Sequence, residues 1–61
     1  MNIPKDPYML LSYINTKLRD DYHNLEDLCM SLNIEPLALE AQLSEIDYFY
    51  VRELNRFAAT S

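Results

Sequence analysis

The chain has 61 residues, a net charge of −5, no glycine and a single cysteine. This length allows one domain over residues 1–61 and excludes a second hydrophobic core. The hydrophobic content of 49% excludes a disordered chain, and the lack of glycine favours helices with short connections over a small β-barrel, whose turns need glycine.

The first predicted helix covers residues 7–20. Asp6 is a suitable N-cap because its carboxylate can accept from the free N–H groups of the first turn, and proline suits the first helical position that Pro7 occupies. An apolar stripe follows at helical spacing, formed by Leu11, Ile14 and Leu18 with Leu10 beside it.

Two shorter helices follow, over residues 25–32 and 36–46. Asn24 is the predicted N-cap of the first of these, and Asn33 ends it because asparagine tolerates the left-handed backbone of a helix stop. Pro36 begins the next helix. Its predicted inward stripe consists of Leu39, Leu43 and Ile46.

After residue 46 the pattern favours strands, because aromatic and β-branched residues predominate. We predict a small hairpin over residues 48–58, with a turn over 52–55 and fraying of residues 59–61. A two-stranded hairpin is marginal alone, so it must pack on the helices through Tyr48, Tyr50 and Phe57.

Residues 25–46 have the spacing of a helix-turn-helix. Cys29 supplies a small residue facing the second helix, Asn33 the turn, and Ile34 with Leu39 the apolar seal. The predicted fold is mainly α: a three-helix bundle with a helix-turn-helix, winged-helix-like, plus a small C-terminal β-hairpin. This arrangement serves DNA binding in some proteins and is simply an economical small core in others.

The charges argue against DNA reading by the third helix. That helix offers Glu40, Glu45 and one Gln42, whereas phosphates and bases are contacted mainly by basic and amide side chains. Its outer face is instead small and nearly uncharged. This face predicts docking of an unidentified protein partner or a homodimer, and it consists of Leu37, Ala38, Ala41 and Ser44.

A second candidate surface is polar and comes from the end of the first helix and the hairpin. It consists of Asn15, Lys17, Arg19, Arg52 and Arg56. Five cations in an acidic chain make a weak nucleic-acid footprint, so a nucleic-acid-binding regulator is the alternative function and a protein-interaction module the leading one. For Asn15 we expect a hydrogen bond to a neighbouring helix end.

No residue pattern indicates catalysis, a cofactor or a metal. His23 and Cys29 are too few for a zinc site, and Cys29 lies on an apolar stripe, where a buried small side chain is expected rather than a nucleophile. A single cysteine favours a reducing compartment, and the longest apolar run near the start is too short for a signal peptide or a membrane span. We therefore expect a non-enzymatic, cytoplasmic protein.

The chain resembles a family of short bacterial proteins, catalogued as domain of unknown function 4250, over residues 2 to about 57. The most specific segments are Pro4-Lys5-Asp6-Pro7 and Asn15-Thr16-Lys17-Leu18-Arg19-Asp20. The family usually has glycine where this chain has Asp47, and a more acidic or proline-containing turn where it has Val51-Arg52. The resemblance implies a stand-alone bacterial protein without known activity, cofactor or binding residues.

Overall fold

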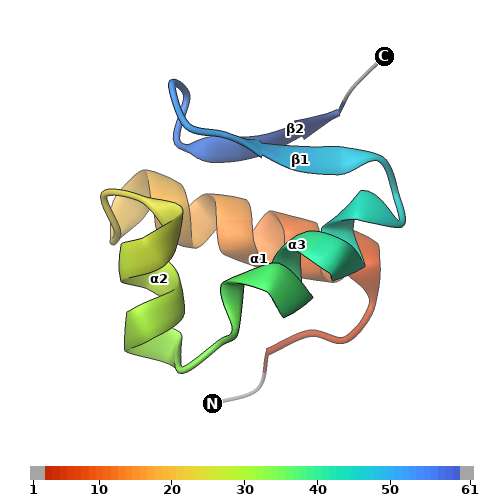
Figure 1. Ribbon diagram of the computed structural model, residues 1–61, viewed down its shortest axis with the longest axis horizontal. Helices are drawn as coiled ribbons and strands as arrows, with labels where there is room; N and C mark the ends of the chain where they lie inside the picture. Colours follow the sequence, from red (N-terminus) through yellow and green to blue (C-terminus); the bar gives the residue numbers. More distant parts are fainter. Residues whose placement is uncertain (1–2, 60–61) are drawn as a thin grey trace.

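The computed structural model describes residues 3–59, which form three helices followed by a two-stranded hairpin. The elements are α1 (Pro7–Asp20), α2 (Leu25–Leu32), α3 (Pro36–Ser44), β1 (Tyr48–Val51) and β2 (Arg56–Ala59). In Figure 1 the hairpin forms a layer across the helices, with α1 passing behind α3. The mainly α prediction with a C-terminal hairpin is confirmed.

The ends of α1 and α2 follow the predicted caps. The Asp6 carboxylate accepts from the backbone N–H of Met9, and the Asn24 side chain accepts from that of Asp27 at 2.7 Å. Asn33 ends α2 in the left-handed conformation, with φ 57° and ψ 48°. The buried stripe of α1 consists of Leu10, Ile14 and Leu18. Leu11, which the prediction placed in the stripe, is only half-buried.

The predicted extension of α3 to residue 46 is wrong, since the helix ends at Ser44. The N–H groups of Ile46 and Asp47 donate to the carbonyls of Leu43 and Ser44, three residues back, so the last turn tightens. Asp47 then takes φ 63°, which turns the chain out of the helix and into β1. Ile46 is half-buried against the core in this turn rather than on the helix.

The hairpin is one residue longer than predicted. β1 and β2 are antiparallel, and Tyr48 pairs with Ala59, Phe49 with Ala58, Tyr50 with Phe57, and Val51 with Arg56. Ala59 is therefore a strand residue rather than a frayed one, because it lies across from Tyr48. The other two residues expected to fray, 60 and 61, lie outside the described residues.

The core lies where the three helices meet the hairpin. All three helices contribute leucines, and Phe57 of β2 is fully buried among them. Tyr48 and Tyr50 pack against this core from β1, as predicted. None of the helices within residues 3–59 is long and apolar enough to cross a membrane.

Candidate ligand-binding cleft between α1 and β2

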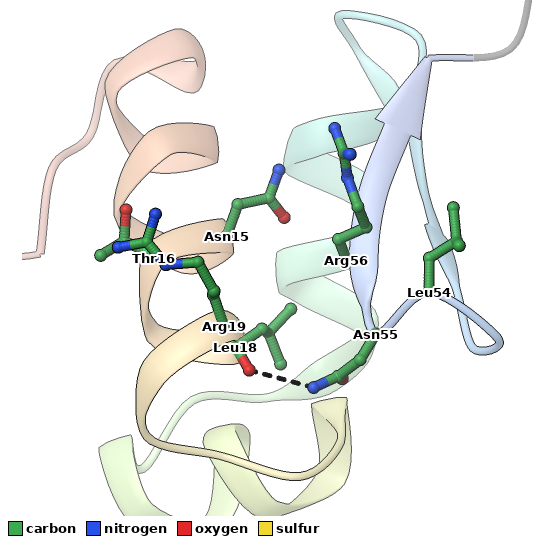
Figure 2. A pocket seen from close by; sticks show the side chains of 7 residues that line it. All are labelled: Asn15, Thr16, Leu18, Arg19, Leu54, Asn55 and Arg56. Carbon is green, nitrogen blue, oxygen red and sulfur yellow. Dashed lines mark hydrogen bonds between the residues drawn. The ribbon is translucent and has the colours of Figure 1, made fainter.

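A cleft separates the second half of α1 from the turn and β2. Its volume is ≈ 600 Å³, within the range of small-ligand sites. Figure 2 shows α1 on one wall and the hairpin on the other. The lining residues are Asn15, Thr16, Leu18, Arg19, Leu54, Asn55 and Arg56.

Asn15 joins the two walls. Its side-chain nitrogen donates to the carbonyl of Phe57 at 3.1 Å, and its oxygen accepts from the Phe57 N–H at 2.8 Å. The expectation of a bond to a helix end is therefore wrong, because the partner is the backbone of β2. One of the two amide hydrogens of Asn15 remains available for a ligand.

Asn55 closes the lower end of the cleft. Its side-chain nitrogen donates to the carbonyls of Leu18 and Tyr22, at 3.0 and 3.1 Å, and its oxygen accepts from the Tyr50 hydroxyl at 2.7 Å. Asn55 has φ 51°, a conformation that asparagine adopts more readily than most residues. The turn thus holds the end of α1, and the cleft is fixed by hydrogen bonds at both ends.

Two arginines line the cleft, Arg19 on α1 and Arg56 on β2, and Figure 2 shows the Arg19 guanidinium beside Thr16, turned away from the hairpin. The Arg19 guanidinium pairs with Asp20 through two contacts of 2.9 Å, and this hydrogen bonding lowers the pKa of Asp20. Both side chains are exposed, so this neighbouring pair is easily exchanged. Arg56 is exposed and has no ion pair within residues 3–59.

The other two predicted cations lie outside the cleft and are engaged elsewhere. Lys17 contacts Asp21 at 3.4 Å and lies over the Tyr13 ring. Arg52 binds Glu26 through contacts of 3.1 and 2.7 Å, which ties the hairpin to α2. Of the polar surface predicted from the sequence, the structure therefore brings together Asn15, Arg19 and Arg56 and separates Lys17 and Arg52 from them.

The predicted outer face of α3 points away from the core. Leu37 is 74% exposed, Ala38 and Ala41 are exposed, and Ser44 is half-buried, its hydroxyl donating to the carbonyl of Ala41 at 2.7 Å. The face is convex helix surface and is not among the residues that line the cleft.

Sequence reasoning missed four lining residues: Thr16, Leu18, Leu54 and Asn55. The available signal was the turn at 52–55, whose asparagine is a turn residue with spare hydrogen-bonding capacity. Nothing in the local sequence indicates that this amide reaches residues 33 and 37 positions away.

Cys29 is buried, as the sequence predicts. Burial, with the nearby Glu26, raises the pKa of its thiol, which disfavours the nucleophilic thiolate. Within residues 3–59 no three potential metal ligands come together.

The comparisons with known proteins identify a family but no activity. A family model described as "Domain of unknown function (DUF4250)" matches residues 4–57. No curated protein and no solved structure matches the chain.

Proposed function

The chain belongs to the family described as Domain of unknown function (DUF4250), and since that description assigns no activity, we propose from its cleft that it is a non-enzymatic protein-interaction module. The α1–β2 cleft binds an acidic segment of a partner protein. The observation that carries the proposal is the pair of exposed arginines, Arg19 and Arg56, in the lining of one cleft.

A carboxylate suits this cleft chemically. A guanidinium presents parallel N–H donors that match the two oxygens of a carboxylate, and Arg56 has no competing ion pair within the described residues. A ligand carboxylate replaces Asp20 at Arg19 with little loss, since the exposed pair contributes little. The exposed side chain of Leu54 offers apolar contact to a neighbouring ligand residue.

The charge balance favours a peptide over a nucleic acid. Residues 24–47 hold six acidic residues and no lysine or arginine. Their negative charge repels the phosphates of a nucleic acid. Lys17 and Arg52, which the nucleic-acid alternative also needs, are paired with carboxylates. Binding of a single carboxylate side chain, by contrast, requires only the two arginines of the cleft.

An amide chemical-shift titration at low salt tests this function. The probes are the blocked peptide acetyl-Leu-Glu-Glu-Leu-amide, its glutamine counterpart and a short DNA duplex. We expect the glutamate peptide alone to shift the amides of Asn15, Arg19 and Arg56. Arg56→Gln abolishes these shifts, and the matched Arg52→Gln retains them. Shifts with DNA alone would favour the nucleic-acid regulator, and no shifts with the peptide would refute the cleft.

The outer face of α3 is a second candidate docking surface, because Leu37 is 74% exposed on a helix whose outer face is nearly uncharged. We propose that α2 and α3, which follow each other through the left-handed Asn33, form the predicted helix-turn-helix and act as a scaffold for this face. Light-scattering mass across a concentration series tests self-association through it. Leu37→Glu is expected to reduce the mass. A strict monomer whose mass does not change with this substitution would exclude self-association through this face.

A further inference from the structure

The two outer edges of the hairpin differ in the hydrogen bonding of their outward backbone groups. The sheet has only β1 and β2 within the described residues, so each strand has one edge without a neighbouring strand. On β2 the outward N–H and C=O of Phe57 are both bonded by Asn15. This side chain occupies the place of a pairing strand and blocks that edge.

The same bonds determine the orientation of β1. Because the polar backbone groups of Phe57 point away from β1, Tyr50 and Phe57 form a non-hydrogen-bonded pair. The N–H and C=O of Tyr50 therefore point outward, and those of Tyr48 do so by strand alternation. No group within residues 3–59 bonds to them.

Apart from its short length of four residues, the β1 edge lacks the features that usually prevent strand addition. Its sequence YFYV has high strand propensity and contains no charge and no proline. Phe49 is 44% exposed on the outer face of the hairpin. Acidic residues outnumber basic ones around this strand: Glu45 and Asp47 precede it, Glu53 follows it, and α3, which carries Glu40, packs against it. The cation next to the strand, Arg52, lies over the Tyr50 ring and is paired with Glu26.

We propose that the outer edge of β1 adds an extended segment of a partner protein in which apolar and basic residues alternate. The backbone of this segment pairs with the outward groups of Tyr48 and Tyr50, which is the mode of strand addition. Its apolar residues cover Phe49, and its basic residues meet the surrounding carboxylates. A second copy of this chain is disfavoured as the occupant, because each copy carries a net charge of −5.

Amide hydrogen exchange tests the edge directly. In the free protein the Tyr48 and Tyr50 amides exchange fast, whereas those of Phe49 and Val51 are protected by β2. A saturating amount of acetyl-Lys-Val-Lys-Val-Lys-amide is expected to slow exchange at Tyr48 and Tyr50 by about tenfold and to leave Phe49 and Val51 unchanged. The same peptide with glutamate in place of lysine leaves all four rates unchanged.

Two variants distinguish peptide binding at the β1 edge from a general effect of surface charge. Phe49→Lys places a repelling cation beside the edge and abolishes the protection by the basic peptide. Met30→Lys makes the same charge change at an exposed position of α2, outside the cleft, and retains it. The proposal is overturned if the basic peptide leaves the Tyr50 rate unchanged, if the acidic peptide protects equally, or if protection rises with protein concentration alone, which would indicate self-pairing. None of these readouts involves the α1–β2 cleft.

Discussion

At the scale of single residues, two asparagines join the helices to the hairpin. Asn15 and Asn55 each bond to backbone groups more than 30 positions away in the chain. Their amides can donate and accept at the same time, which no apolar side chain of similar size can do. These residues therefore define the shape of the cleft without providing its charge.

Replacement of Asn15 by leucine is expected to lower the free energy of unfolding by about 2–3 kcal/mol, because it leaves the half-buried N–H and C=O groups facing it unpaired. Urea denaturation followed by circular dichroism measures the change. Thr16→Ala is the matched control, one residue along the same helix turn and exposed, and should cost less than about 0.5 kcal/mol. Equal effects of both substitutions would contradict this role of Asn15.

Asp47 is the residue at which local strain is expected. It has φ 63°, in the left-handed region that favours glycine. Asp47→Gly is expected to raise the free energy of unfolding by roughly 0.5 kcal/mol, the relief of left-handed strain less the added freedom of the unfolded chain. Asn33→Gly is the comparison, since Asn33 has a similar φ of 57° but a side chain that tolerates it better. A larger gain at Asn33 in urea denaturation would argue against this explanation.

At the scale of elements, the helix ends that local side chains determine could be predicted and the others could not. The start of α1 and both ends of α2 follow from Asp6, Asn24 and Asn33, which act within their own turns, and the polar break that begins at Asp20-Asp21 marks the end of α1. The end of α3 has no such cap and depends on the backbone of Asp47, so its prediction was two residues too long. Likewise, Arg19 and Arg56 were recognisable as polar candidates, but their place in the lining of one cleft depends on contacts distant in sequence.

The ion pair between Arg52 and Glu26 makes the attachment of the hairpin to α2 sensitive to acid. Hydrogen bonding to Arg52 lowers the pKa of Glu26 below its ordinary value of 4.5. The pair therefore stabilises the fold above that pH, and the contribution disappears as the pH falls through the lowered pKa. Glu26→Gln should be slightly less stable than the native chain at pH 6, and the difference should become smaller at pH 3.

Urea midpoints at the two pH values measure this effect. Glu53→Gln is the matched control, because Glu53 neighbours Arg52 in the chain but has no ion pair within the described residues. A difference between Glu26→Gln and the native chain that stays equally large at low pH would show that the effect does not come from ionisation. An equal loss of stability in Glu53→Gln would likewise show that the effect does not come from the ionisation of Glu26.

At the scale of the whole molecule, charge and core are distributed unevenly. The acidic excess lies in residues 24–47, which include α2 and α3, whereas the cleft with its arginines lies on the opposite elements, α1 and β2. The module thus has an acidic side beside β1 and a cationic cleft beside β2. This separation is the physical basis for assigning partners of opposite charge to the two edges of one hairpin.

The core makes helices and hairpin a single cooperative unit, because Phe57 of β2 is fully buried among the helical leucines. A domain of this size has roughly 3–5 kcal/mol of stability, and removing a buried phenylalanine ring costs about as much. Phe57→Ala is therefore expected to unfold the helices as well as the hairpin, with loss of the helical circular dichroism signal at 25 °C. Phe49→Ala, on the exposed face of the partner strand, should retain a cooperative melt. A Phe57→Ala chain that kept its helical signal and melted cooperatively would mean that the three helices fold without the hairpin, and the cleft would then depend on a separately docked element.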